Sequence, residues 1–205
     1  MTAGMGSYDW RFDSGRICLD LVATSETASG AASGAASGAE EPLAEAGRLG
    51  QWLVGAGLVP AGTPLAAVDG HWAAGFVELR DCVGQLVRAQ IDGRCAEFAL
   101  ERVNVFAAGP PPGVRAVRAP DGSLVRTLSA APDCEALLAA VARDAVELLT
   151  DPASRARLRR CEGDSCRRVY LDTSRGRRRR WCSSEVCGNR ERVARHRRRA
   201  AVARA

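Results

Sequence analysis

Residues 161–190 read CEGDSCRRVYLDTSRGRRRRWCSSEVCGNR and contain four of the eight cysteines of the chain. These four form two CxxxxC pairs, Cys161 with Cys166 and Cys182 with Cys187, with fifteen residues between the pairs. In a cytosolic chain, two close cysteine pairs that flank a loop are more typical of a metal site than of disulfides. Four thiolates match a closed tetrahedral site, so we predict one structural Zn²⁺ bound by these four side chains. Disulfides and an iron–sulfur cluster are the alternatives that the spacing leaves open.

The residues around these cysteines offer little else to fold around. Between residues 155 and 205 the large apolar side chains are few, chiefly Leu158, Val169, Tyr170, Leu171, Trp181, Val186 and Val193. So small a core cannot offset the conformational entropy of the segment, whereas metal binding contributes folding free energy directly. We expect a strand over 169–171, a basic turn over 172–180 and a helix over 190–204 that begins near Cys187. Trp181 is expected to cover the metal site.

The charge of the chain is divided unevenly at Ser154. Residues 1–154 hold 11 Arg and 19 acidic residues, a net charge of −8, whereas residues 155–205 hold 18 Arg and 5 acidic residues, a net charge of +13. With so few acids to compensate them, the C-terminal arginines are more typical of a phosphate-binding surface than of a solvated face. The candidate nucleic-acid-binding residues are Arg177, Arg178, Arg179, Arg180, Asn189, Arg190, Arg192, Arg195, Arg197, Arg198 and Arg199. Asn189 and Arg190 suit base edges, and Asn189 is equally suited to cap the helix.

The sequence before residue 154 predicts a mostly helical domain. Apolar residues spaced by three and four indicate a helix from Pro42 to Gly57, with the proline in its first turn. The same spacing over residues 68–108, interrupted at Asp92-Gly93, indicates two antiparallel helices. A further helix is expected after Asp133, which would cap it.

Two segments of this domain do not follow a helical period. Residues 114–118 and 123–128 flank Asp121-Gly122, a pair typical of the turn of a β-hairpin. Residues 10–24 are apolar without a clear period, and we expect either a short strand or a helical turn there.

The expected fold class is therefore mainly α with a small β-hairpin (α+β), followed by a small zinc-stabilised finger of the four-cysteine type. We assign residues 1–153 to the helical domain and residues 154–205 to the finger with its basic C-terminal helix. Residues 24–41 read TSETASGAASGAASGAEE, and such small polar repeats predict a low-complexity loop within the helical domain.

Several classes of protein are disfavoured by the sequence. No apolar stretch approaches the roughly 18 residues of a membrane span, and the first thirteen residues lack a secretory pattern, so we expect a cytoplasmic protein without membrane contact. The chain has two histidines, no Gly-rich phosphate loop and no GxSxG motif, so we do not expect an enzyme. The other cysteines, expected to be small buried hydrophobic residues, are Cys18, Cys82, Cys95 and Cys134.

The residues just described resemble a known family. The strings Trp181-Cys182-Ser183 and Cys187-Gly188-Asn189-Arg190, together with the upstream CxxxxC pair, resemble the CGNR zinc finger of bacterial proteins. Residues 18–24, CLDLVAT, resemble the start of the ABATE domain that usually precedes this finger. Ala23 departs from the Asn that is common there, whereas Arg192 matches a usual basic position. The resemblance spans nearly the whole chain, and it implies four cysteine ligands and a nucleic-acid face that includes Asn189 and Arg190.

That family is described as stress-induced transcription regulators, with DNA binding assigned to the finger. We therefore expect a bacterial transcription regulator that binds double-stranded DNA through one zinc-stabilised finger and is associated with the nucleoid when bound. An RNA- or ribosome-associated zinc-binding protein is the main alternative, because phosphate contacts do not distinguish the two polymers. A protein-interaction adaptor, in which the acidic domain masks the basic finger, is a further alternative. A homodimer and a small-molecule effector of the helical domain are further expectations.

Overall fold

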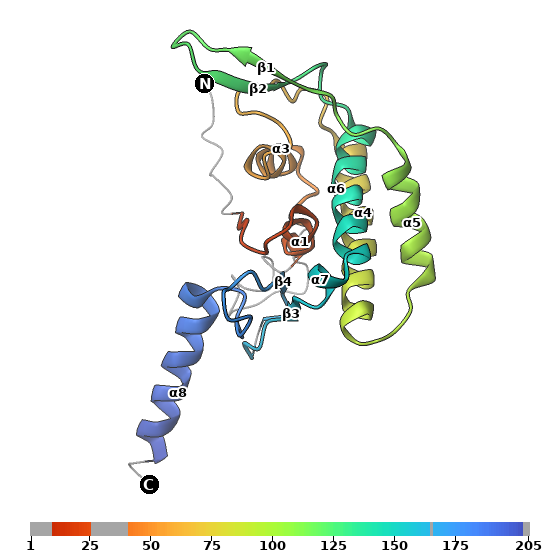
Figure 1. Cartoon of the computed structure of the whole chain (residues 1–205). Helices are drawn as coiled ribbons and strands as arrows, with labels where there is room; N and C mark the ends of the chain where they lie inside the picture. Colours follow the sequence, from red (N-terminus) through yellow and green to blue (C-terminus); the bar gives the residue numbers. More distant parts are fainter. Residues whose placement is uncertain (1–9, 26–40, 165, 203–205) are drawn as a thin grey trace.

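The computed structural model describes residues 10–25, 41–164 and 166–202, and most of the loop predicted over 24–41 lies outside them (Figure 1). The elements in chain order are α1 (Ile17–Val22), α3 (Ala46–Gly55), α4 (Gly70–Ile91), α5 (Glu97–Ala108), β1 (Val114–Arg118), β2 (Leu124–Leu128), α6 (Cys134–Thr150), α7 (Pro152–Arg155), β3 (Leu158–Arg160), β4 (Val169–Leu171), the π-helical turn η1 (Ser184–Gly188) and α8 (Asn189–Val202). The predicted class, mainly α with small antiparallel hairpins, is confirmed. The described residues form two hairpins rather than one, because β3 and β4 also pair.

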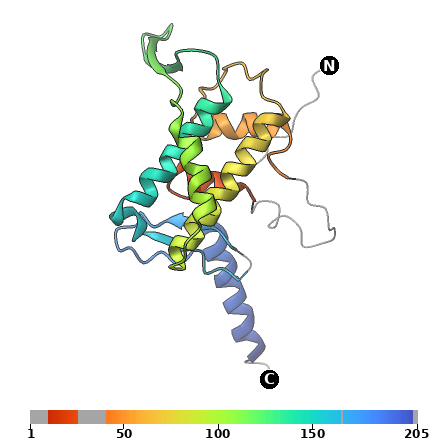
Figure 2. The same ribbon diagram turned by 90° about the vertical axis from the view of Figure 1, so that its right-hand side faces the viewer.

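Three long helices form the body of the helical domain. α4 lies beside both α5 and α6, and α5 also packs on α6 (Figures 1 and 2). Asp69 caps α4 by accepting hydrogen bonds from the backbone of His71 and Trp72, and Asp133 caps α6 as predicted. Gly93 has a φ of +65° at the predicted break between α4 and α5. The periodic pattern therefore located these helices correctly.

α1 is the short central helix of the domain, and residues 10–24 thus contain a helix rather than a strand. Its residues Cys18, Leu19, Leu21 and Val22 are buried against α4 and α6. Six residues cannot form a stable helix alone, so packing must hold this one. Asp144 of α6 accepts a hydrogen bond from the backbone nitrogen of Cys18 (3.0 Å), which satisfies an otherwise free donor of the first turn.

The start of α3 differs from the prediction. The helix begins at Ala46 rather than at Pro42, because the chain before it is held in a turn. The guanidinium of the buried Arg80 donates two hydrogen bonds to the carboxylate of Glu41, at 2.5 and 2.9 Å. Leu43 is fully buried directly afterwards. These two anchors fix residues 41–45 outside the helix.

β1 and β2 form the predicted hairpin, which extends from the body beyond α3 (Figure 1). Val114 lies opposite Leu128 and Arg118 opposite Leu124. Gly122 has a φ of +85°, in the left-handed region that a tight turn requires and that glycine adopts without strain.

The second hairpin, β3–β4, joins the finger to the helical domain. Leu158, Val169 and Leu171 are buried in the same hydrophobic core as the side chains of α1, α4 and α6. The backbone nitrogen of Leu171 donates to the carbonyl of Ser14 at 2.8 Å. The finger therefore shares its base with the helical domain, whereas α8 projects away from the body (Figure 1). In the part of the chain that the structure describes, no helix is long and apolar enough to cross a membrane.

Candidate metal centre and cationic helix

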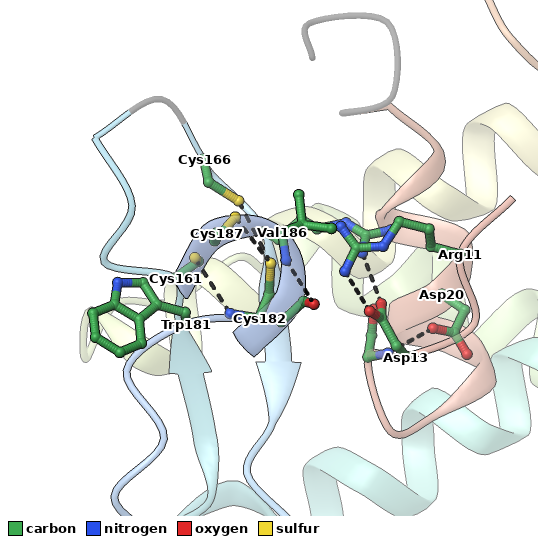
Figure 3. Close-up of polar contacts among 12 residues, drawn as sticks. Arg11, Asp13, Asp20, Cys161, Cys166, Trp181, Cys182, Val186 and Cys187 are labelled. Carbon is green, nitrogen blue, oxygen red and sulfur yellow. Dashed lines mark hydrogen bonds and ion pairs between the residues drawn. The ribbon is translucent and has the colours of Figure 1, made fainter. Parts of the chain in front are cut away.

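The four cysteines of the two CxxxxC pairs come together at one point. Their sulfur atoms all lie within 4.8 Å of one another, with Cys166 Sγ 3.8 Å and Cys187 Sγ 3.6 Å from Cys182 Sγ. Figure 3 shows these side chains turned toward one another. All four cysteines are free, and the separations far exceed a disulfide bond of about 2.05 Å. The disulfide alternative is therefore wrong for this structure.

The sulfur spacing fits a tetrahedral metal ion. Sulfur atoms around a tetrahedral ion with metal–sulfur bonds of about 2.3 Å lie about 3.8 Å apart. The separations of 3.6 and 3.8 Å agree with that value. Three of the four side chains are buried and that of Cys166 is partly exposed. The residues present therefore fit a closed structural site with no position left for a catalytic water.

The surrounding backbone holds the cysteines in place. Cys161 follows β3, and its backbone nitrogen donates to the carbonyl of Arg168 at 2.8 Å. A turn closed by the Cys166 nitrogen and the Gly163 carbonyl (2.9 Å) brings Cys166 back toward Cys161. The backbone nitrogen of Cys182 donates to Cys161 Sγ at 3.3 Å, which joins the two pairs directly. Cys187 lies in η1, so two of the four cysteines precede the basic turn over 172–180 and two follow it.

The proximity of the four thiols also perturbs their protonation. Hydrogen bonds from the thiols of Cys166 and Cys182 lower the pKa of Cys161. Beside the resulting thiolate, the pKa of Cys166 is raised to about 12, and that of Cys182 is raised as well. The negative charge of one thiolate thus opposes ionisation of the neighbouring thiols. Four thiolates at this spacing therefore require a cation to neutralise them.

A group of buried side chains supports the loop between the two cysteine pairs. The Tyr170 hydroxyl donates to the carbonyl of Arg179 at 2.6 Å, and burial raises the pKa of this phenol. Burial alone would raise the pKa of Asp172. Hydrogen bonds from Ser174 and from the Arg179 nitrogen (3.0 Å) outweigh this effect, so the pKa of Asp172 is lowered. The basic turn predicted over 172–180 is thus closed at both ends by the Asp172 carboxylate.

Arg179 itself belongs to this support, although the sequence placed it with the phosphate-binding residues. Its guanidinium lies over the Tyr170 ring at 4.8 Å and donates to the carbonyls of Trp181 and Cys182. A run of four arginines carries no local signal that distinguishes the inward-facing one. Only the position of Tyr170, nine residues earlier, identifies Arg179 as the partner.

The other members of the arginine run are at the surface. The side chains of Arg177 and Arg178 are exposed. Arg180 is also exposed, but it donates to Glu162 at 2.6 Å and lies over the Trp181 ring at 5.2 Å. Trp181 is partly buried against the cysteine cluster, which confirms that it covers the metal site.

α8 carries the remaining candidate nucleic-acid-binding residues. They lie at the surface, namely Asn189, Arg190, Arg192, Arg195, Arg197, Arg198 and Arg199. Arg192 donates to the Ser184 carbonyl at 3.4 Å, and Arg198 pairs with Asp164 at 3.3 Å. The helix expected over 190–204 is observed up to residue 202, and residues 203–205 lie outside the described part.

Asn189 does not cap this helix. Its φ and ψ of −69° and −44° are helical, and it continues directly from η1. The cap is Ser183, which has extended backbone angles and accepts a hydrogen bond from the Val186 nitrogen at 3.3 Å. The helical run therefore begins before Cys187, and the Asn189 side chain is left at the surface.

A polar cluster at the start of the described chain contacts the finger, and no sequence pattern indicated it. Arg168, whose side chain is almost fully buried, donates to Asp13 at 2.8 Å, and Arg11 pairs with the same carboxylate. Asp20 of α1 accepts a hydrogen bond from the Ser14 nitrogen at 2.9 Å, and burial raises its pKa to about 6. Figure 3 shows Arg11, Asp13 and Asp20 beside the cysteine cluster.

The four other cysteines lie apart from the cluster. Cys18, Cys82 and Cys134 are buried as predicted, but Cys95 is exposed in the connection between α4 and α5. The prediction was wrong for Cys95, because its place after the turn at Gly93 removes it from the helical face that packs on the core.

Comparison with known protein families assigns both parts of the chain. Residues 15–152 match the ABATE family, described as "Putative stress-induced transcription regulator", and residues 157–200 match the CGNR zinc finger. No curated protein matches the chain significantly. The ABATE match covers more than half of the chain and the order of the two matches is the expected one, so the chain belongs to the ABATE family and carries a CGNR zinc finger behind its ABATE domain.

Proposed function

We propose that this protein is a DNA-binding transcription regulator whose finger is held by one structural Zn²⁺. The observation that carries the proposal is the position of α8. The helix begins beside the four-cysteine cluster and projects from the body with six arginines and a single acid, Glu191. An isolated cationic helix with a rigid base is suited to lie against the phosphates of a nucleic acid.

The metal supplies folding free energy and fixes Cys187 relative to Cys161 when it is bound. Because η1 runs directly into α8, fixing Cys187 also sets the direction in which α8 leaves the body. Asn189 and Arg190, in the first turn of the exposed helix, would contact base edges in this arrangement. Arg177 and Arg178 would contact phosphates from the basic turn, whereas Arg179 is occupied within the finger.

Salt dependence of binding tests the nucleic-acid part of this proposal. If about six phosphates are neutralised, the slope of log affinity against log salt for duplex DNA should be about −5. Arg195→Ala should make the slope about 0.9 shallower, whereas Arg94→Ala, a variant of an exposed arginine between α4 and α5, should leave it unchanged. Fluorescence anisotropy with labelled duplex measures both, and a wild-type slope shallower than about −2 would contradict phosphate-driven binding.

The same titration with structured RNA and with single strands identifies the polymer. Tighter binding to RNA than to duplex DNA at equal salt would favour the RNA- or ribosome-associated alternative. Binding to duplex DNA implies a cytoplasmic protein that is associated with the nucleoid while bound.

Elemental analysis tests the metal. We expect one zinc per chain after purification under reducing conditions, and Cys182→Ser should abolish it. Cys95→Ser is the matched control, because Cys95 is exposed and lies outside the cluster. Iron in place of zinc, or stoichiometric metal retained by Cys182→Ser, would overturn the assignment.

A further inference from the structure

Exposed apolar side chains are concentrated on two consecutive elements, α5 and the β1–β2 hairpin. In the described part of the chain, nine large hydrophobic side chains are exposed, and six of them lie on these elements. They are Phe98, Leu100 and Val105 on α5, and Val114, Leu124 and Val125 on the hairpin. The Phe98 side chain is 76% exposed. Apolar surface gathered in this way is typical of an interaction site.

Each element packs on the body with one face only. α5 buries Ala99 and Val103, and helical spacing places Phe98, Glu101 and Val105 on the opposite side. Figure 2 shows α5 crossing in front of the other helices, with nothing drawn over it.

The hairpin is attached in the same one-sided way. Leu128 is buried, and Arg126 donates to the Gly57 carbonyl at 2.8 Å, so the face that holds these two residues contacts the body there. Val114, Arg118 and Leu124 share this face but remain exposed. Side chains alternate along a strand, so Arg115 and Val125 lie on the other face. A two-stranded sheet is marginally stable alone, and this one lacks a partner for its outer face in the described chain.

The two elements carry opposite charges. α5 exposes Glu97 and Glu101, whereas the hairpin exposes Arg115 and Arg118. None of these four side chains forms an ion pair among the described residues; Arg115 donates to the Thr127 hydroxyl and Arg118 to the Gly122 carbonyl. The outer face of the hairpin of one molecule, with Arg115 and Val125, is thus complementary in both apolar surface and charge to Phe98, Glu101 and Val105 of α5 in another.

We propose that α5 and the hairpin form the interface of a homodimer, in which the hairpin of each copy lies across α5 of the other. Such an arrangement is closed by a two-fold axis, because both copies use the same pair of surfaces. The metal site and α8 lie at the opposite end of the molecule from the hairpin, so both fingers stay accessible (Figure 1). The proposal does not depend on the identity of the metal or of the nucleic acid.

Sedimentation of the full metal-loaded chain tests this interface. We expect a wild-type dimer, and Phe98→Ser should raise its dissociation constant by about tenfold or more, equivalent to about 1.4 kcal/mol. Phe98 is too exposed for this change to unfold the protein, which circular dichroism and metal content will verify. Val193→Ser is the matched control, because it removes a half-exposed apolar side chain from α8 and should leave the dimer intact.

Charge reversal identifies which surfaces meet. Glu101→Arg alone and Arg115→Glu alone should each weaken the dimer by about tenfold, and the two changes together should restore it. A wild-type monomer at all concentrations, a dimer that Phe98→Ser leaves unchanged, a combined variant that stays dissociated, or a dimer that Val193→Ser disrupts would each overturn the proposal.

Discussion

Arg178 and Arg179 are adjacent in the sequence but have different surroundings. The Arg179 guanidinium contacts the Tyr170 ring and two backbone carbonyls of the finger, whereas the Arg178 side chain is exposed. Arg179→Lys keeps the positive charge but loses the planar fork that makes these contacts, so it should destabilise the metal-bound finger by about 2 kcal/mol. Arg178→Lys should have no such effect. Competition with a chromogenic chelator measures the difference, and equal metal retention by the two variants would contradict the structural role of Arg179.

Asp20 should make the stability of the protein depend on pH. Its pKa is raised to about 6 by burial, against about 3.9 in an unfolded chain. Between these values the folded state binds more protons than the unfolded state, so stability falls as pH rises through this window. The nearby charges act in opposite directions, since Asp13 raises the pKa of Asp20 and Arg168 lowers it.

Asp20→Asn removes this titration while keeping an acceptor for the Ser14 nitrogen. The variant should be more stable than wild type at pH 7.5, and its advantage should be smaller at pH 5 by about 1 kcal/mol. Urea unfolding of both proteins at each pH measures the difference between their free energies of unfolding. The pH dependence of metal binding is common to both proteins and cancels in this difference. An advantage that is equal at both pH values would show that Asp20 is already ionised in the folded protein.

At the scale of the element, α8 is a helix that its own sequence does little to stabilise. It packs chiefly on η1 at its start, and Arg192, Arg195 and Arg199 repel one another at spacings of three and four. We expect its amide hydrogens to exchange rapidly in the free protein and at least about tenfold more slowly with duplex DNA, because phosphates relieve the repulsion.

A single variant separates helix stability from phosphate binding. Arg195→Glu places an acid four residues before Arg199, so it should slow exchange in the free protein but weaken DNA binding. Hydrogen exchange followed by mass spectrometry measures both effects, with α6 as the internal reference. Exchange in α8 that is already slow without DNA would contradict this account.

The elements that the sequence predicted are those in which local pattern and burial agree. α4, α5 and α6 each bury one face, so their apolar residues recur at helical spacing. α4 and α6 are each also preceded by an aspartate that caps the helix. α1 is buried on nearly all sides, so its residues show no period. β3 is three residues long and two of them are arginines, a composition that no strand pattern detects. The metal ligands were predictable because four cysteines at fixed spacing allow few other interpretations.

The junction between the helical domain and the finger could not be predicted, because it depends on contacts between distant residues. Leu158 and Leu171 look like minor apolar residues of a charged segment, yet they complete the core of the helical domain. Arg168 and Asp13 are 155 residues apart in the chain and form a partly buried ion pair. For the whole molecule, the boundary near residue 154 therefore divides the sequence patterns but not the hydrophobic core.

Because the core is shared, we expect the metal to be released and the helical domain to unfold in a single transition. Removing the metal should loosen the β3–β4 hairpin, expose Leu158, Val169 and Leu171, and thereby destabilise the helices packed on them. We expect metal release and loss of helical circular dichroism to share one urea midpoint, and a chelator to lower it. Leu171→Ser should lower the midpoint for both signals, whereas Val193→Ser should change neither.

Two separate transitions, with the helical one unaffected by the chelator, would mean that the finger is an independent unit. In that case the isolated segment 154–205 would keep its metal and bind DNA unaided, whereas a shared core requires the isolated segment to lose metal affinity.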